Sequence, residues 1–268
     1  MSGQRTSALE IAKKKARGEK IVVLTSYDSA TAPLVEQAGV DVILVGDSVG
    51  NVMLGYPDSL PVTLEDMIRH TGAVVRSTER VHVVLDLPFM SYQPSVEQAV
   101  RSAGRAIKET GCGAVKLEAG EAWVDTARAI VRAGIPVMGH IGFTPQYMHV
   151  LRSKRVKAES PEAQQAFVNL ARRLEDAGCY ALVLELVPRS LAARVTAALE
   201  IPTIGIGSGP ECDGQVLVLH DILGIGGGAK LRHVKQYANL GEEILNAARR
   251  FCEDVRSGAF PTDEHCFE

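Results

Sequence analysis

Short apolar runs alternate along this chain with longer segments in which apolar residues recur every three or four positions. The runs are nearly continuous and rich in Val, Ile and Leu, as expected for parallel strands that are buried on both faces. The longer segments carry their charges on one side, which is typical of amphipathic helices. The predicted strands are 21–28, 40–47, 81–88, 114–120, 136–142, 180–188, 202–209 and 215–223.

Eight strand and helix units in a chain of 268 residues predict an α/β fold, a (β/α)8 TIM barrel with an N-terminal leading helix. A doubly wound open sheet is the alternative, but the G-x-G-x-x-G turn expected after its first strand is missing. No linker, low-complexity segment or close repeat divides the chain. We therefore expect residues 1–268 to form a single (β/α)8 barrel catalytic domain.

Composition and charge favour small-molecule chemistry. The net charge of -3 and the pI near 6.2 leave no excess of basic surface, so neither nucleic acid nor an anionic membrane is the expected partner. The N-terminus carries charges where a signal peptide needs its apolar run, and no stretch approaches the roughly 20 apolar residues of a membrane span. Five scattered cysteines form no C-x-x-C pair. We expect a cytoplasmic protein with free thiols.

Polar residues cluster where the predicted strands end. In a (β/α)8 barrel the carboxyl ends of the strands surround the active site, so these residues are candidates for function. An acid in this place has a simpler explanation as a helix cap or turn residue, and for Asp47 the two interpretations are equal. The candidates are Asp47, Ser48, Asp86, Lys116, Glu118, His140 and Glu185.

Three of these residues are hard to explain as structure alone. Asp86 has apolar neighbours on both sides, where a charge is costly to bury unless a cation compensates it. Lys116 and Glu118 alternate along one strand, so both side chains point to the same face. They could form a simple ion pair, but two charges directed into a barrel favour a functional role.

Glu185 and His140 differ in how clearly the sequence indicates a functional role. Glu185 lies in the most apolar of the predicted strands, and a carboxylate in such a setting suits a general base. For His140, a substrate contact and a core histidine satisfied by its neighbours are comparable explanations. Carboxylates without a thiolate or histidine cluster favour a hard cation such as Mg²⁺. A 2-oxo acid would chelate that ion and be polarised toward an enolate.

The motifs in their order resemble one family over nearly the whole chain. They are "TSYD" at 25–28, "LVGDSVG" at 44–50, "LPVTLEDM" at 60–67, "LDLPFMSY" at 85–92, "VKLEAG" at 115–120, "GHIGFTPQ" at 139–146, "LVLELVP" at 182–188, "IPTIGIGSGPECDGQVLVLHDILG" at 201–224 and "FPTDEHCF" at 260–267. This set is similar to that of the ketopantoate hydroxymethyltransferases, the folate-dependent enzymes of pantothenate biosynthesis. The resemblance implies a barrel assembled as a homodecamer.

The resemblance also implies a reaction and roles for individual residues. The reaction moves a hydroxymethyl group from methylene-tetrahydrofolate to α-ketoisovalerate through a Mg²⁺-stabilised enolate, which gives ketopantoate. Glu185 corresponds to the proton acceptor of the family. The residues that correspond to the Mg²⁺ ligands are Asp47, Asp86 and Glu118, and those that correspond to the 2-oxo acid contacts are Asp47, Ser48, Asp86 and Lys116.

The chain departs from the family in one loop. After "TPQ" the family has a glycine-rich segment, whereas residues 151–160 of this chain read "LRSKRVKAES". Glycines allow backbone conformations that Arg and Ser do not adopt cheaply. Either the loop drifted without consequence, or the chain is a paralogue that takes another 2-oxo acid or one-carbon donor. A Mg²⁺-dependent 2-oxo acid lyase and a non-catalytic binding protein are the remaining alternatives.

Overall fold

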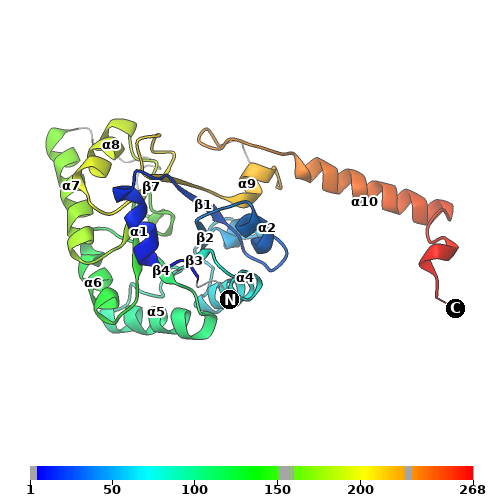
Figure 1. Ribbon diagram of the computed structural model, residues 1–268, viewed down its shortest axis with the longest axis horizontal. Coiled ribbons are helices and arrows are strands. Elements are labelled where there is room, and N and C mark those ends of the chain that lie inside the picture. The colour runs from blue at the N-terminus through cyan, green and yellow to red at the C-terminus, as the bar shows by residue number, and fades with distance from the viewer. Residues whose placement is uncertain (1–4, 151–157, 159, 227–230, 268) are drawn as a thin grey trace. The chain divides into compact units, whose positions relative to one another are not determined.

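A closed barrel of eight parallel strands forms the centre of the structure (Figure 1). The structure is a computed structural model that describes residues 5–150, 158, 160–226 and 231–267. Each strand pairs with its neighbours in chain order, and β1 closes the barrel against β8. The strands are β1 (Ile21–Thr25), β2 (Val42–Val45), β3 (His82–Asp86), β4 (Ala114–Glu118), β5 (Val137–Gly142), β6 (Ala181–Glu185), β7 (Thr203–Ile206) and β8 (Gly214–Leu217). The predicted fold class is confirmed.

In the unit Met1–Val218, helices lie around the barrel and connect its successive strands (Figure 1). Three short 3₁₀ helices add to them: Glu121–Trp123, Pro145–Tyr147 and Asp263–His265. The α-helices are α1 (Ala8–Ala16), α2 (Ala32–Gln37), α3 (Val49–Val52), α4 (Leu64–Ser77), α5 (Val96–Thr110), α6 (Val124–Arg132), α7 (Pro161–Asp176), α8 (Arg189–Ala198), α9 (Leu219–Leu223) and α10 (Leu240–Ser257).

Capping side chains fix where several helices begin. Thr63 forms a capping box with Asp66 at the start of α4, and the Ser95 hydroxyl accepts the Gln98 N–H at the start of α5. Ser160 does the same for α7, which begins at Pro161. These local signals could be seen in the sequence, and they set the angle at which each helix leaves its loop.

The leading helix covers one end of the barrel. Ala8 and Ile11 of α1 are buried and join the interior core, which is otherwise built from strand residues such as Val42, Ala114 and Met138. Because Arg5 donates hydrogen bonds to Val75 O, Thr78 O and Val81 O, the chain before α1 is tied to the end of α4. The leading helix therefore packs at the amino-terminal end of the strands, opposite the end at which the sequence predicts the site.

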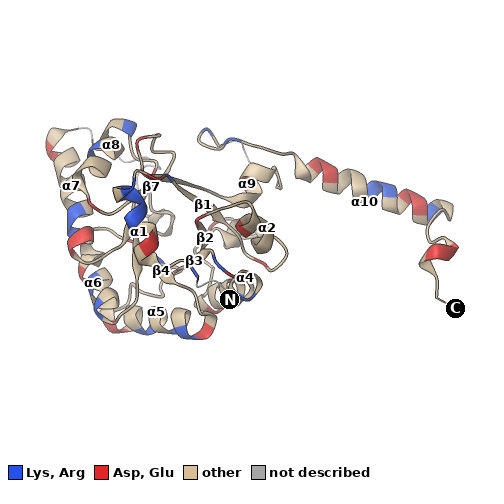
Figure 2. Cartoon of the chain, in the orientation of Figure 1, with Lys and Arg blue, Asp and Glu red and all other residues tan. Residues whose placement is uncertain are grey.

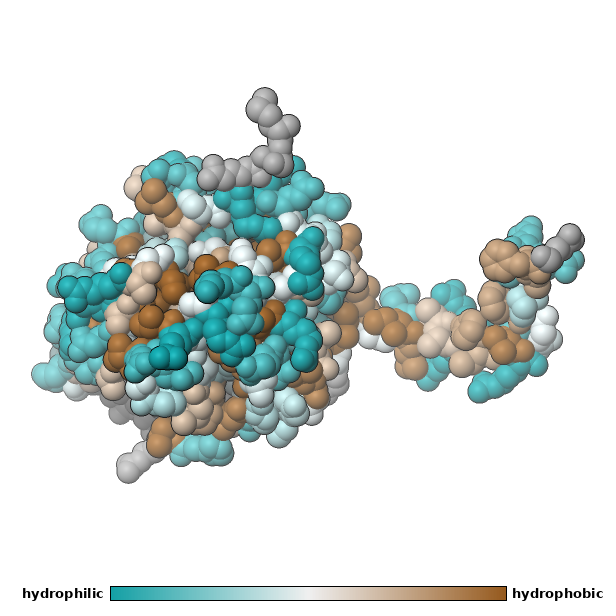
Figure 3. Space-filling view, turned by 90° about the horizontal axis from the view of Figure 1, so that it is seen from below, coloured by the Kyte–Doolittle hydropathy of each residue, from teal (hydrophilic) through white to brown (hydrophobic). Residues whose placement is uncertain are grey.

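The described chain divides into two compact units, Met1–Val218 and Leu219–Glu268. All eight strands lie in the first unit. The eighth strand is shorter than predicted, because residues 219–223 form helix α9 instead. That residues 1–268 act as one catalytic domain stays a prediction. In the second unit α10 has no buried residue, and apolar surface is visible on this unit in Figure 3.

Charged residues of both signs are mixed along the outer helices (Figure 2). On α5, for example, Arg101 pairs with Glu97, and Arg105 pairs with both Glu109 and Glu65. Among the described helices, none combines the length and the apolar character that crossing a bilayer requires. The sequence departure at 151–160 lies almost wholly outside the described residues.

Candidate active site

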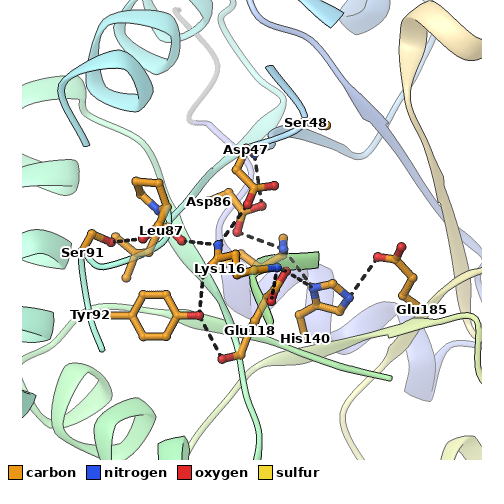
Figure 4. Close-up of polar contacts among 12 residues, drawn as sticks. Asp47, Ser48, Asp86, Leu87, Ser91, Tyr92, Lys116, Glu118, His140 and Glu185 are labelled. Atoms are coloured by element: carbon orange, nitrogen blue, oxygen red, sulfur yellow. Dashed lines mark hydrogen bonds and ion pairs between the residues drawn. The ribbon is translucent and has the colours of Figure 1, made fainter. Parts of the chain in front are cut away.

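Neighbouring strands place four of the candidate residues side by side at their carboxyl ends (Figure 4). Asp86 of β3 is in register with Lys116 of β4, and Glu118 of β4 is in register with His140 of β5. All four side chains are buried. Glu185 ends β6 and is the most accessible of the group, with 19% of its side chain exposed. Strand periodicity therefore directs a polar set into the barrel mouth, as predicted.

Lys116 is the positive centre of this set. Its Nζ lies 2.9 Å from Asp86 Oδ1 and 3.3 Å from His140 Nδ1. Burial works to lower the pKa of Lys116, but the charges of Asp86, Asp47 and Glu118 outweigh it and raise that pKa above the ordinary value. The ammonium group is therefore charged, and it offers only donors.

The carboxylates are crowded beyond what one ammonium can compensate. Burial raises the pKa of Asp86 to about 7, although Lys116 pulls the other way. Burial and the nearby Asp47 charge raise the pKa of Glu118 well above its usual range. Asp47 adds a third buried acid, and its N–H reaches Asp86 Oδ2 at 3.4 Å. A second positive charge would stabilise this arrangement.

His140 connects the ammonium group to Glu185. Because Lys116 has no acceptor to offer, His140 Nδ1 accepts from it and the ring proton belongs on Nε2. Nε2 lies 3.2 Å from Glu185 Oε2. Burial, helped by the Lys116 charge, lowers the pKa of His140, so the ring is neutral. Among the described residues Nε2 makes no directed hydrogen bond, so the contact with Glu185 is a close approach of the two groups.

The backbone around Glu185 is shaped for close approach and held in place. A Cβ at Gly142 would lie 2.2 Å from Glu185 O, and Gly142 has a φ of +114°, so only glycine fits here. Leu186 follows Glu185 with a φ of 50°, an uncommon conformation for a residue with a side chain. The Ser208 hydroxyl donates to Leu184 O at 2.7 Å and accepts the Val187 N–H at 3.1 Å.

These contacts give the "GIGSG" segment at 205–209 a structural role. Its buried serine bridges the residues on either side of Glu185, and Gly207 and Gly209 have positive φ values of 65° and 99°. Tight turns therefore account for these glycines. The segment supports the loop that carries the predicted base.

Ser48 lies beside the acidic group but makes a different contact. Its Oγ is 2.8 Å from Tyr27 OH, and it begins the short helix α3 directly after Asp47. Figure 4 shows Ser48 apart from the chain of contacts that joins the other candidates. The predicted role of Ser48 as a substrate contact stays a prediction.

Two residues that the sequence did not single out complete the network. Gln146 is buried and bonds to both Asp47 and Glu118 through its side-chain Nε2 and its backbone N–H. Tyr92 OH lies 2.9 Å from Gln146 Oε1 and 3.2 Å from Glu118 O. Both stand in motifs that follow a strand, "GHIGFTPQ" and "LDLPFMSY". A polar residue just beyond a strand end was the available signal.

The residues fit a hard cation by their chemistry. Asp86 Oδ1 is buried and, among the described residues, receives no directed hydrogen bond beyond its ion pair with Lys116. Oxygen donors with surplus negative charge suit Mg²⁺. In the part of the chain that the structure describes, no three His, Cys, Asp or Glu side chains are grouped closely enough to hold an ion as they stand. The ligand set Asp47, Asp86 and Glu118 therefore stays a prediction.

Solved structures of the same architecture support the assignment of the fold. The fold is similar to that of 2,3-dimethylmalate lyase, a PEP mutase/isocitrate lyase superfamily member, with a TM-score of 0.62 and 16% identity over 99% of this chain and 93% of that one. Phosphonopyruvate hydrolase is similar with a TM-score of 0.63 and 12% identity over 97% and 93%. At such identity the likeness shows the fold alone, a (β/α)8 barrel.

Sequence comparison supplies the family. The family model of the ketopantoate hydroxymethyltransferases matches residues 5–263. The 3-methyl-2-oxobutanoate hydroxymethyltransferase of Moorella thermoacetica is 52% identical over 98% of both chains, and that of Syntrophomonas wolfei is 52% identical over 95% of this chain and 92% of its own. The chain belongs to the ketopantoate hydroxymethyltransferase family, and it is an enzyme of the transferase class. The predicted family is thereby confirmed.

Proposed function

We propose that this enzyme transfers a hydroxymethyl group from methylene-tetrahydrofolate to α-ketoisovalerate and so forms ketopantoate for pantothenate biosynthesis. The activity for which the two relatives are named, each of them 52% identical to this chain, supports this proposal. The observation that carries the proposal is the position of Glu185: its carboxylate stands at the edge of the buried Lys116 and Asp86 pair, and His140 lies between them.

The charged residues have separate proposed roles in binding the 2-oxo acid. Asp47, Asp86 and Glu118 would hold Mg²⁺, which would supply a Lewis acid to polarise the keto group of the 2-oxo acid. Lys116 contacts the carboxylate or keto oxygen of the substrate and balances the negative charge that develops there. Asp47, Ser48 and Asp86 are the other proposed substrate contacts, and His140 is a candidate contact beside them.

Glu185 moves the proton. Its carboxylate removes the hydrogen from carbon three of α-ketoisovalerate, and the electron pair of that C–H bond shifts toward the keto group. His140 Nε2 lies 3.2 Å from Glu185 Oε2, beside the proposed base, and the other carboxylate oxygen of Glu185 is the one proposed to accept the proton. Water breaks the two C–N bonds of the methylene group, which releases tetrahydrofolate and leaves the one-carbon unit as formaldehyde. Carbon three adds to the formaldehyde carbon, and the resulting alkoxide takes up a proton to become the hydroxymethyl group.

The alternatives differ in what they require of the chain. A paralogue with another 2-oxo acid or one-carbon donor would keep the same acids and base, and its difference would lie at residues 151–160. A Mg²⁺-dependent lyase with a cysteine acid needs a thiol at the barrel mouth. Cys112 and Cys179 instead precede β4 and β6 and are buried, and burial raises the pKa of Cys179 to about 12. That placement disfavours the lyase.

Family resemblance carries the remaining assignments. We propose a homo-oligomer, a decamer by that resemblance, that binds a small 2-oxo acid and a folate in the cytoplasm and has neither nucleic acid nor membrane as a partner. Residues 1–268 form one catalytic domain in this proposal.

Product formation tests the proposed reaction. Purified protein with Mg²⁺, methylene-tetrahydrofolate and α-ketoisovalerate should form ketopantoate, detected by mass spectrometry. Glu185→Gln should lower kcat by about 10²- to 10⁴-fold, the usual contribution of a general base. The matched control is Glu200→Gln at an exposed position, which should leave kcat unchanged. A folded, metal-loaded protein that turns over no ketopantoate would refute the proposal.

A further inference from the structure

Gln146 forms hydrogen bonds to residues at the ends of several different strands. It belongs to the 3₁₀ helix Pro145–Tyr147 after β5, yet its bonds reach residues at the carboxyl ends of β2, β3 and β4. Nε2 donates to Asp47 Oδ2 at 3.0 Å and to Leu87 O at 2.9 Å. Oε1 accepts from Tyr92 OH at 2.9 Å and from Gln93 Nε2 at 3.0 Å.

These four bonds use the full capacity of the amide. A glutamine side chain has two N–H donors and an oxygen with two lone pairs, and each one is matched here. Turning the amide over would place its oxygen against the Asp47 carboxylate and Leu87 O, and its donors against Tyr92 and Gln93. The orientation of the amide is therefore fixed, and it delivers an N–H to Asp47.

The backbone of the same residue holds a second acid. Gln146 N–H lies 3.0 Å from Glu118 Oε2 and 3.3 Å from Oε1. Asp47 and Glu118 come from different strand ends, and both carboxylates are buried beside other acids that repel them. A donor for each one limits how far the repulsion can separate them.

We propose that Gln146 is a positioning residue that orients Asp47 and Glu118 for binding a divalent cation. The inference rests on the proposed function, because it assumes that these acids hold the ion. Partners that orient metal ligands usually change metal affinity by about 10- to 100-fold when they are lost. Gln146 would act through the two carboxylates and need not touch the ion or the substrate.

Manganese binding to the full-length protein tests this role without turnover. The dissociation constant for Mn²⁺ is measured by electron paramagnetic resonance for the natural protein, Gln146→Met and Gln93→Met. Methionine matches glutamine in length and lacks its donors. Gln146→Met should raise the constant by about 10- to 100-fold. Gln93→Met, which loses a bond to Oε1 but none to a carboxylate, should leave it unchanged.

A second readout separates positioning from collapse of the site. At saturating Mn²⁺ the deuterium exchange of α-ketoisovalerate by Gln146→Met should recover toward the rate of the natural protein, because a positioning role through metal ligands is rescued by the ion. If Gln146→Met does not fold, Gln146→Asn keeps an amide, falls short of Asp47 by one methylene group and should also raise the constant.

Each result bears on the proposal. A folded Gln146→Met or Gln146→Asn protein that binds Mn²⁺ as tightly as the natural protein would overturn the role of Gln146 and leave the proposed function intact. A natural protein that forms ketopantoate but binds no Mn²⁺ or Mg²⁺ would overturn the cation site itself, and this inference with it.

Discussion

The two ends of the barrel each bury a histidine, and they treat it in opposite ways. At the amino-terminal end, His82 Nδ1 faces Thr6 O and Nε2 faces Tyr180 OH, each at 3.0 Å. The carbonyl can only accept, so the ring proton is on Nδ1. At the carboxyl end, His140 accepts from Lys116 through Nδ1 and carries its proton on Nε2.

The difference teaches how to separate a structural group from a functional one. His82 has two neutral partners and an edge-to-face contact with the Tyr180 ring, whose centroid is 5.6 Å away. His140 stands among Lys116, Glu118 and Glu185, and burial raises the pKa of Glu118 well above its usual range. A buried group that is hydrogen-bonded to neutral partners indicates a structural role, whereas a buried group among several charged side chains indicates a ligand-binding site.

Among variants that leave the proposed base intact, removing the ammonium group should have the largest effect on the carboxyl end. Lys116→Met should lower kcat/KM by about 10²- to 10³-fold, as expected when a donor to developing negative charge is lost. The control is Lys108→Met on the exposed side of α5. It removes the same single positive charge as Lys116→Met and should retain full activity. Steady-state kinetics with saturating Mg²⁺ checks this, and equal rates for the two variants would contradict the role of Lys116.

Without metal, the carboxyl end should lose stability as the pH rises. The pKa of Asp86 is raised from 3.8 to about 7 in the folded state, so between these values the folded protein binds more protons than the unfolded chain. Its contribution is complete below the unfolded pKa and is lost as the pH rises through the folded one, on the order of 3 to 4 kcal/mol. Denaturant unfolding in EDTA measures this slope, which Asp86→Asn should flatten.

The amino-terminal end should show the opposite slope. Burial lowers the pKa of His82 from 6.5 to about 4, so the unfolded chain binds the extra proton between these values. Stability is complete above the unfolded pKa and falls as the pH drops toward the folded one, by about 3 kcal/mol. In His82→Gln this part of the slope should vanish. An unchanged slope would show that His82 is not the titrating group.

The smallest effect should come from the partner of His82. Tyr180→Phe keeps the ring contact but leaves His82 Nε2 without its hydrogen bond, which should cost about 1 to 3 kcal/mol of unfolding free energy. Denaturant curves check the loss. Turnover at a temperature where the variant stays folded should equal that of the natural protein, and a fall in kcat would contradict the division between the two ends.

Periodicity was enough to predict the barrel and most of its mouth. Apolar runs predicted the strands because parallel strands that are buried on both faces consist of nearly continuous apolar residues. Asp86, Lys116 and Glu185 were noticeable as charged residues inside those runs. The eighth run extended too far, since a short apolar stretch looks the same in a strand as in a short helix such as α9.

The supporting residues could not be predicted in the same way. Gln146 and Asp47 are 99 positions apart, and they meet only because the barrel closes. The sequence likewise left His140 open between a core residue and a contact. Its neighbours became known only when β4, β5 and β6 were placed in register. Loop residues and pairings between strands depend on tertiary geometry that local pattern does not contain.

Deuterium exchange at carbon three of α-ketoisovalerate tests the central claim most directly. In heavy water with Mg²⁺ and without folate, NMR should show the natural protein and Tyr180→Phe exchanging this hydrogen, while EDTA or Glu185→Gln abolishes the exchange. That result would place proton removal, its base and its cation at the carboxyl end of the barrel. No exchange by the folded, Mg²⁺-loaded protein, or equal exchange by Glu185→Gln, would contradict the account.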